Sequence, residues 1–499
     1  MKKSTLLSLA LVASGISQAA VNKPNVLIIY TDEHNFRTLE SYLPLMGEAQ
    51  RHPWGNNVPL TTPNIKFLSD NGVIMNNCYV STPVSTPSRA SFMTGLYPQK
   101  TNCITNDIAL NTSLKTLPQL FAENGYETGY AGKWHLSGEA KPGWTPMPNY
   151  GWNSNKYMFN RGHYKSIKEN INGGNPLLVK KESTLEPGYD FMTDYLTSKA
   201  QEFIVSQKAK PFLFFLSIPD PHSANVVSQP YYNLFKDFNF QKPPTAAKDM
   251  SLYPGWASGN VNLTQDDYRN YWGMVKCIDD NIGKLISTLK TNGLLENTII
   301  IFTSDHGDMA GEHGRVDKSI PLDASMKVPF IIYAPKLLPA QKVVNEAVSN
   351  IDVFPTLAEL CGLNNMPKVD GISIVPLLKG NKAAKGRNCV FSRSTGLNTG
   401  WLSVTTDRYK LVFSTKTGDE PWLFDKQVDP DELINYYNKS SYLKIKASLT
   451  KKLIEYCEKN NEPKFEDAKI RQELGLKALK GSSANPLSVG TETRNKSEE

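Results

Sequence analysis

The sequence is poor in the residues that build thiolate metal sites or disulfide scaffolds. Its 499 residues include only six cysteines, none of them in a CxxC pair, so a zinc site made of cysteines is not expected. One or two disulfides can form if the chain is exported, but the spacing does not reveal their pairing. The 55 basic and 48 acidic residues leave a net charge of +7, scattered along the chain. We therefore expect no nucleic-acid partner, whereas a mild positive excess suits an anionic small molecule or polymer.

Long hydrophobic runs are also lacking. The first 20 residues combine two lysines, a short apolar stretch at 6–16 and the sequence Ser17-Gln18-Ala19, a pattern typical of a cleaved secretory signal. The apolar stretch is too short to span a bilayer, and no cysteine follows the cleavage site to carry a lipid. We predict a signal peptide at residues 1–19, a periplasmic or secreted protein, and no membrane insertion.

Apolar residues make up 40% of the chain and gather in short runs. Strand-like runs occupy residues 25–30, 211–216, 298–303 and 328–333, and helical patterns occupy residues 116–124, 193–207 and 266–292. Short runs without alternation are typical of strands covered on both faces. Strands that alternate with helices predict an α/β fold, with a large mixed, mostly parallel sheet between layers of helices. Ligands in such folds bind beyond the carboxyl ends of the strands.

The chain divides into regions of different character. We predict a large α/β domain at residues 20–380, with a loop insertion at 137–190 that is rich in Gly, Pro, Asn, Trp and Tyr. Short strand-like pieces and one helix then predict a smaller α+β subdomain with an antiparallel sheet at 381–480. The polar tail at 481–499 is typical of disorder.

Polar residues follow two of the predicted strands. Asp32 and Glu33 come after the first run, and Asp305 and His306 come after the third. Carboxylates with one imidazole suit Ca²⁺, Mg²⁺ or Mn²⁺ better than zinc. The alternative for either pair alone is the N-cap of the next helix.

A serine-rich segment at 85–95, Ser-Thr-Pro-Ser-Arg through Thr-Gly, predicts a turn that leads into a helix whose backbone N–H groups face an anion. Taken alone it is only a serine-rich turn. Together with the other segments it resembles the signature of the formylglycine-dependent sulfatases of the alkaline phosphatase superfamily, which is Cys or Ser, any residue, Pro, a small residue, Arg and a short run to Thr-Gly. Five motifs stand in the order of that family, at 24–32, 85–95, 129–136, 219–222 and 303–318.

The resemblance implies a fold like that of alkaline phosphatase and a role for each motif residue. Ser85 would be oxidised to formylglycine (3-oxoalanine) by a maturing enzyme that accepts serine, because a hydrated aldehyde can release sulfate where a serine sulfate ester cannot. One divalent cation, usually Ca²⁺, would be held by Asp32, Glu33, Ser85, Asp305 and His306. Arg89 would hold the hydrate, His135 would act as base and His222 as acid, and Lys133 with Lys318 would hold the sulfate.

The resemblance leaves the substrate open, with a sulfated polysaccharide or its oligosaccharides as the expectation. Arg161, His163 and Lys165 of the insertion, together with His313, are candidate substrate-binding residues. Six aromatic residues of the insertion either stack on sugars or pack the insertion against the core: Trp144, Tyr150, Trp152, Tyr157, Phe159 and Tyr164. Two alternatives remain, namely a phosphonate monoester or phosphodiester hydrolase of the same superfamily, and a non-catalytic binder of sulfated glycans with unmodified Ser85.

Overall fold

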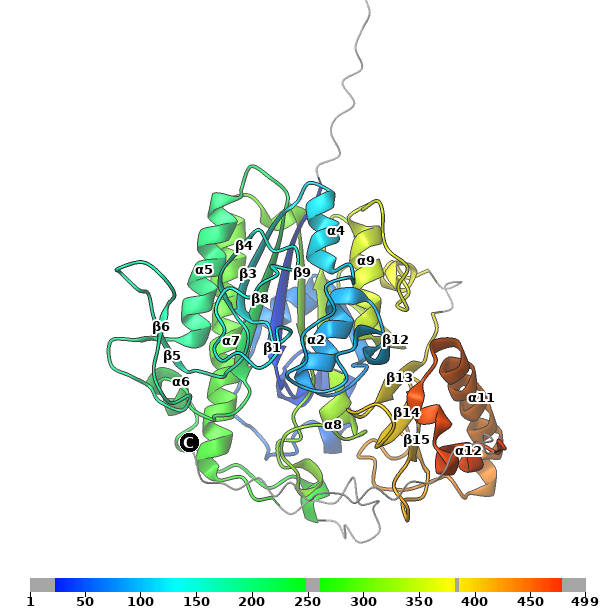
Figure 1. Cartoon of the computed structure of the whole chain (residues 1–499). Helices are drawn as coiled ribbons and strands as arrows, with labels where there is room; N and C mark the ends of the chain where they lie inside the picture. Colours follow the sequence, from blue (N-terminus) through cyan, green and yellow to red (C-terminus); the bar gives the residue numbers. More distant parts are fainter. Residues whose placement is uncertain (1–22, 248–260, 382–385, 478–499) are drawn as a thin grey trace, which may run out of the picture.

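A nine-stranded sheet forms the centre of the part of the chain that the computed structural model describes, residues 23–247, 261–381 and 386–477 (Figure 1). The predicted signal peptide and the tail at 481–499 lie outside these residues. The strand order is β10-β2-β11-β9-β1-β8-β3-β4, with β12 paired to β2. The strands are β1 (Asn25–Asp32), β2 (Val73–Tyr79), β3 (Glu127–Lys133), β4 (Ser154–Phe159), β8 (Phe212–Pro221), β9 (Thr298–Ser304), β10 (Lys327–Val328), β11 (Phe330–Tyr333) and β12 (Lys342–Ser349).

The middle of the sheet is parallel. β1 lies between β8 and β9 and runs parallel to both, and β8 in turn pairs in parallel with β3. The predicted runs therefore correspond to β1, β8, β9 and β11, and only β11 is antiparallel to its neighbours β9 and β2. Because the carboxyl ends of β1, β3, β8 and β9 meet at one edge, the residues that follow these strands come together there.

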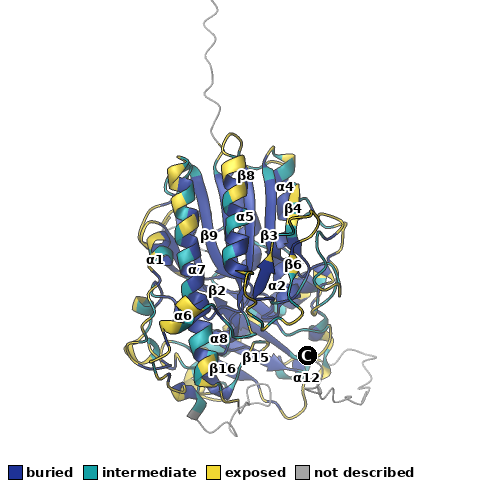
Figure 2. Cartoon of the chain, turned by 90° about the vertical axis from the view of Figure 1, so that its left-hand side faces the viewer, coloured by how far each residue is buried: buried dark blue, intermediate teal, exposed yellow. Residues whose placement is uncertain are grey.

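Helices cover both faces of the sheet, as predicted. Val26 and Ile28 of β1 pack into a core with α2, α4 and α9, whereas Leu27 and Ile29 pack into a second core with α1, α5 and α7, as the alternation of side chains along a strand requires. Figure 2 shows the buried sheet behind α5 and α7, whose outer turns are exposed. These helices are α1 (Pro63–Asp70), α2 (Ser85–Thr94), α4 (Leu117–Glu123), α5 (Met192–Ser206), α7 (Gln265–Thr291) and α9 (Val353–Leu360).

The C-terminal region carries the predicted antiparallel sheet. It consists of β13 (Val390–Arg393), β14 (Trp401–Thr405), β15 (Tyr409–Ser414) and β16 (Trp422–Asp425), with α11 (Leu443–Asn460) and α12 (Ala468–Glu473) packed against it. Lys410 of β15 is fully buried, and its Nζ lies 2.6 Å from Asp323 Oδ1 and 2.5 Å from Glu432 Oε1. Asp323 begins α8 (Asp323–Met326) in the large domain, so this ion pair joins the two regions.

The segment 137–190 is more than a loop insertion. Its strand β4 extends the large sheet in parallel with β3, and β5 (Ser166–Lys168), β6 (Leu177–Leu178) and β7 (Asp190–Phe191) form a small separate sheet. Four of its six aromatic residues are buried: Tyr150, Trp152, Phe159 and Tyr164. The interpretation that the aromatics pack the insertion against the core is therefore correct for these four.

All six cysteines are buried and unpaired, so neither of the disulfides considered from the sequence is formed. Burial is the first cause that raises the pKa of each thiol, which keeps the reactive thiolate scarce. Within the described residues, no helix has the length and apolar character needed to cross a membrane.

Candidate active site

Ser85 is the first residue of α2 and lies at the carboxyl edge of the sheet. Its side chain is buried, and its Oγ lies 3.1 Å from His306 Nε2. His306 follows β9, and its Nδ1 lies 3.0 Å from the Gly307 carbonyl oxygen. Because a carbonyl only accepts, Nδ1 carries the hydrogen, and the Nε2 lone pair faces Ser85.

Two carboxylates complete a group that fits a cation. Asp305 Oδ1 and Asp32 Oδ1 lie 3.5 Å and 3.8 Å from His306 Nε2, and the three residues can hold one metal ion between them. Asp32 Oδ1 is buried without a hydrogen-bond partner, which is costly unless a ligand satisfies it. Oxygen ligands with one imidazole, whose tautomer is set by a carbonyl, fit a divalent cation.

Glu33, which was also predicted as a metal ligand, contacts His222 and Lys318 instead of His306. Its Oε2 lies 2.9 Å from His222 Nε2 and 3.0 Å from Lys318 Nζ, while Oε1 is buried without a partner. Burial alone would raise the pKa of Glu33, but the charges on His222 and Lys318 hold it well below its usual range. Its role as a metal ligand stays a prediction.

Arg89 and Lys133 surround the same carboxylates with positive charge. Arg89 Nη2 lies 3.2 Å from Asp32 Oδ2 and 2.9 Å from Asp305 Oδ2, and its Nη1 donates to the Lys133 carbonyl. Lys133 Nζ lies 2.5 Å from Asp32 Oδ2. Although burial raises it, the pKa of Asp32 is held well below its usual range by Lys133 and Arg89. The Asp32 carboxylate therefore stays ionised.

His135 is held by a residue that the sequence did not single out. His135 Nε2 lies 2.9 Å from Asp107 Oδ1, whereas His135 Nδ1 is buried without a partner. The carboxylate fixes the hydrogen on Nε2 and leaves Nδ1 as a free base. Burial lowers the pKa of His135 to about 4, with Asp107 acting in the opposite direction. His135 is therefore neutral near neutral pH.

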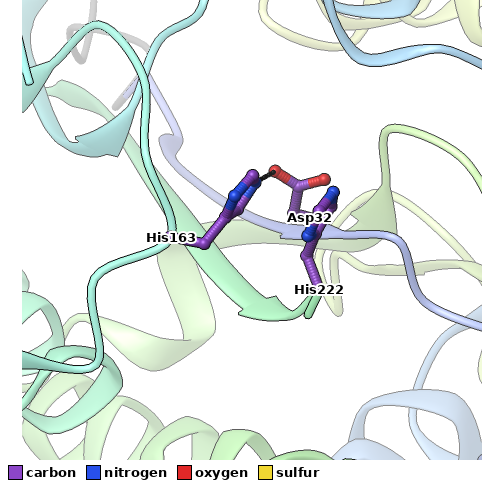
Figure 3. Close-up of side chains that lie close together, drawn as sticks. All are labelled: Asp32, His163 and His222. Atoms are coloured by element: carbon purple, nitrogen blue, oxygen red, sulfur yellow. Dashed lines mark ion pairs between the residues drawn. The ribbon is translucent and has the colours of Figure 1, made fainter. Parts of the chain in front are cut away.

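His222 lies beside His163 and Glu33. Figure 3 shows its ring near the His163 ring and the Asp32 carboxylate. The two imidazoles stack with centroids 3.6 Å apart and planes 6° apart. Asp32, His163 and His222 are also spaced for a metal ion. However, Lys133 Nζ lies 2.7 Å from His163 Nε2, and Lys318 Nζ lies 2.9 Å from His222 Nε2. Two ammonium groups at this distance favour an anion at this place rather than a second cation.

The structure separates the predicted substrate-binding residues, and the Lys165 side chain is fully buried. His163 lies in the site, and Arg161 forms an ion pair with Asp107 at its rim. His313 is buried, and its backbone N–H donates to Thr245 Oγ1. Sequence reasoning missed Asp107, because a single Asp in a loop has no spacing that marks it.

Comparisons with known proteins identify the family and several relatives. The family described as Sulfatase matches residues 24–363, and the family described as N-sulphoglucosamine sulphohydrolase, C-terminal, matches residues 311–459. The chain is 28% identical over 469 residues to the uncharacterized sulfatase YidJ of Escherichia coli, with 89% of each chain covered. It is 26% identical over 521 residues to the N-acetylglucosamine-6-O-sulfatase of Bacteroides thetaiotaomicron, with 88% of each covered.

The fold is similar to that of a protein solved in complex with its substrate D-glucosamine-2-N,6-O-disulfate. The TM-score is 0.74 at 23% sequence identity, and the match covers 89% of this chain and 99% of the other. At this identity the likeness establishes the fold, which agrees with the predicted α/β architecture and its C-terminal antiparallel sheet.

Proposed function

Because the chain belongs to the sulfatase family and is a sulfuric ester hydrolase, we propose that it removes sulfate from a sulfated polysaccharide or from its oligosaccharides. One observation carries the proposal: Ser85, a cation-binding group and three buried or nearly buried basic side chains converge at one edge of the sheet. The name of the Bacteroides relative, a sulfatase of an amino sugar, supports a carbohydrate substrate.

We infer that Ser85 is converted to formylglycine by a maturing enzyme that accepts serine. The hydrated aldehyde supplies a nucleophilic hydroxyl and a second hydroxyl through which sulfate is released by C–O cleavage. Asp32, Asp305 and His306, together with residue 85, would hold one divalent cation, with Ca²⁺ as our first choice. That cation would neutralise sulfate oxygens and lower the pKa of the attacking hydroxyl.

The remaining residues bind charge and move protons. Lys133 and Lys318 would hold the sulfate oxygens, and Arg89 would fix the carboxylates of Asp32 and Asp305, with which it pairs. His135 Nδ1 is the unprotonated position that can accept a proton from the hydrate. His222 Nε2 can deliver a proton to the leaving alcohol, which matters most for a sugar because a sugar alkoxide is a poor leaving group.

The decisive experiment has two measurements on protein from its native host. A panel of sulfated oligosaccharides is scored for released sulfate and for the position that loses it. The mass of the peptide at 81–100 is measured in parallel, and we expect it to be lighter than the unmodified peptide by one hydrogen molecule. Ser85→Ala is the control, since it cannot be oxidised and should release no sulfate.

Other outcomes would point to the two alternatives. Faster turnover of an aryl phosphonate than of an aryl sulfate would indicate a phosphonate monoester or phosphodiester hydrolase. An unmodified Ser85 peptide together with glycan binding but no sulfate release would indicate a non-catalytic binder.

The cation is tested by removing it. Chelation should abolish sulfate release and lower the melting temperature, because a ligand that binds only the folded state stabilises it. Re-addition of Ca²⁺ should restore both, and restoration by Mg²⁺ alone would contradict our choice of metal. We also propose that the protein is periplasmic or secreted, which N-terminal sequencing of the mature chain checks by a start near Ala20.

A further inference from the structure

His135 and His222 transfer protons in the proposed function. Three alternate residues of the insertion contact these histidines or their partners: Arg161, His163 and Lys165. The inference below rests on that proposed function. Arg161 forms an ion pair with Asp107, His163 stacks on His222, and Lys165 donates to the His222 carbonyl. One short segment therefore contacts the supports of both histidines.

The first support runs from Arg161 through Asp107 to His135. Arg161 Nη1 binds Asp107 Oδ2, which leaves Oδ1 to accept the hydrogen of His135 Nε2 at 2.9 Å. Thr86, the residue after Ser85, links Asp107 and His135 to the start of α2. Its Oγ1 accepts from the Asp107 backbone N–H and donates to the His135 carbonyl. This network fixes the tautomer and the position of His135 relative to Ser85.

The second support holds His222. Lys165 is fully buried, and its Nζ lies 2.5 Å from Asp220 Oδ1 and 2.9 Å from the His222 carbonyl oxygen. The His163 ring lies flat against the His222 ring. His163 is itself held by Glu182, whose Oε2 accepts from the His163 backbone N–H at 2.9 Å. The backbone and the ring of His222 are thus both held from the insertion.

The contacts of these residues differ from those of a substrate-binding surface. Lys165 is 0% exposed in its side chain and cannot touch a sugar. The guanidinium of Arg161 is engaged by Asp107, and both nitrogens of the His163 ring face charged groups, Lys133 and Glu182. The polar atoms of Lys165 and of the His163 ring are thus engaged inside the protein, as is Nη1 of Arg161.

We propose that residues 161–165 are a positioning segment, in which Arg161 acts through Asp107 on the base His135, while His163 and Lys165 orient the acid His222. We call the contact of Arg161 with Asp107 the first arm, and His163 with Lys165 the second arm. The two arms serve different steps of the reaction. Loss of the first arm should slow release of sulfate from residue 85, whatever alcohol has left. Loss of the second should slow only the step in which the alcohol leaves.

The two arms are tested with one sugar sulfate and one activated aryl sulfate. Asp107→Asn should lower kcat by about 10²-fold on both substrates with little change in KM, because Asn no longer imposes the Nε2–H tautomer on His135. His163→Ala should lower kcat for the sugar sulfate about tenfold or more while it spares the aryl sulfate. His163→Phe, which keeps a flat ring against His222, should recover most of this loss. Asp266→Asn is the control, since Asp266 pairs with Arg269 at the exposed start of α7.

A readout independent of turnover separates this proposal from the proposed function. With nitrogen-15 histidine, NMR of the seven imidazoles should show His135 with its hydrogen on Nε2 in the wild type and a mixture of tautomers in Asp107→Asn. If the wild-type enzyme releases no sulfate, the proposed function fails, while the tautomer still decides the first arm. An unchanged tautomer would overturn the positioning role, as would variants that raise KM for the sugar sulfate alone. Melting temperature and metal content confirm that each variant is folded and loaded.

Discussion

The partners of His222 determine where it can carry a proton. Its Nδ1 lies 2.6 Å from the Ser223 carbonyl oxygen, so Nδ1 holds a hydrogen permanently. Its Nε2 lies between the ammonium of Lys318 and the carboxylate of Glu33. Nε2 can accept from Lys318 when His222 is neutral and donate to Glu33 when it is protonated. The proton that comes and goes is therefore on Nε2.

His222→Ala should separate substrates by their leaving group. We expect kcat on sugar sulfates to fall by about 10²-fold or more, and kcat on activated aryl sulfates to fall less than about tenfold, because only the sugar alkoxide needs a proton as it leaves. Steady-state kinetics on both substrates measures this ratio, with exposed His52→Ala as the control. An equal loss on both substrates would remove His222 from the role of acid.

Another histidine, His34, should make the fold sensitive to acid. It is fully buried, with its ring nitrogens near Thr31 Oγ1 and Thr38 Oγ1, and burial lowers its pKa to about 3. Between about pH 6.5 and that value, the unfolded chain binds a proton that the folded chain does not. Stability should therefore fall as pH drops below about 6.5, by up to about 1.4 kcal/mol per pH unit from His34 alone.

Urea denaturation at pH values from about 7 to about 5 measures this slope. His34→Gln should flatten it, while His52→Gln at an exposed position should leave it unchanged. A wild-type slope that His34→Gln does not alter would assign the acid sensitivity to other groups.

The motif residues were predictable from sequence for two reasons. Asp32, Asp305 and His306 are polar residues that directly follow predicted buried strands, whereas Ser85 and Arg89 were identified by the resemblance to the sulfatase signature. The fold brings all five together. The support residues in the loop and the insertion were not predictable, since a lone carboxylate or lysine acquires its role only from the tertiary contact it makes.

At the scale of elements, the close approach of β3 and β8 sets the position of Lys133. Gly132 pairs with Ser217 and has a φ of +109°, and a Cβ at this position would overlap the Ser217 carbonyl oxygen. The Ser217 hydroxyl also donates to the Lys133 carbonyl at 2.7 Å. Glycine here lets the strand that ends in Lys133 lie against β8.

Gly132→Ala should destabilise the protein by about 3 kcal/mol or more, because strained φ and steric overlap add. Gly125→Ala is a matched control, since Gly125 also has a positive φ of 78° but no atom within 4 Å of its added Cβ; we expect a cost of about 1 kcal/mol there. Urea denaturation of both variants gives the comparison. Equal costs would mean that the contact with Ser217 relaxes easily.

Elements differed in how well sequence revealed them. β1, β8 and β9 are continuous apolar runs and were predicted. β3 was missed because its sequence, Glu-Thr-Gly-Tyr-Ala-Gly-Lys, has no apolar run, although six of its seven residues pair with β8 in register. β4 was assigned to the loop insertion because the surrounding segment is rich in Gly, Pro and Asn and has few periodic apolar positions.

At the scale of the whole molecule, Lys410 connects the C-terminal sheet to the large domain through Asp323 and Glu432. All three side chains are buried, and the two carboxylates hold the pKa of Lys410 above its ordinary value although burial acts to lower it. A buried charge that loses its partner is strongly destabilising, even where the intact pair adds little net stability.

Lys410→Met should therefore lower the free energy of unfolding by roughly 3–5 kcal/mol. Lys66→Met is the control, because Lys66 pairs with Asp70 on the exposed face of α1 and should change stability by less than about 1 kcal/mol. Urea denaturation followed by fluorescence measures both. A Lys410 variant as stable as the control would show that water or rearrangement compensates the two carboxylates.

The six buried thiols make the molecule a reporter of its own opening. Cys78, Cys277 and Cys361 lie in the large domain, and Cys389 and Cys457 lie in the core of the C-terminal sheet. A maleimide added to the folded enzyme finds no exposed sulfur. The rate at which each cysteine is labelled therefore reports when the region around it unfolds. The order of labelling would show whether the region of the large sheet or the C-terminal sheet unfolds first.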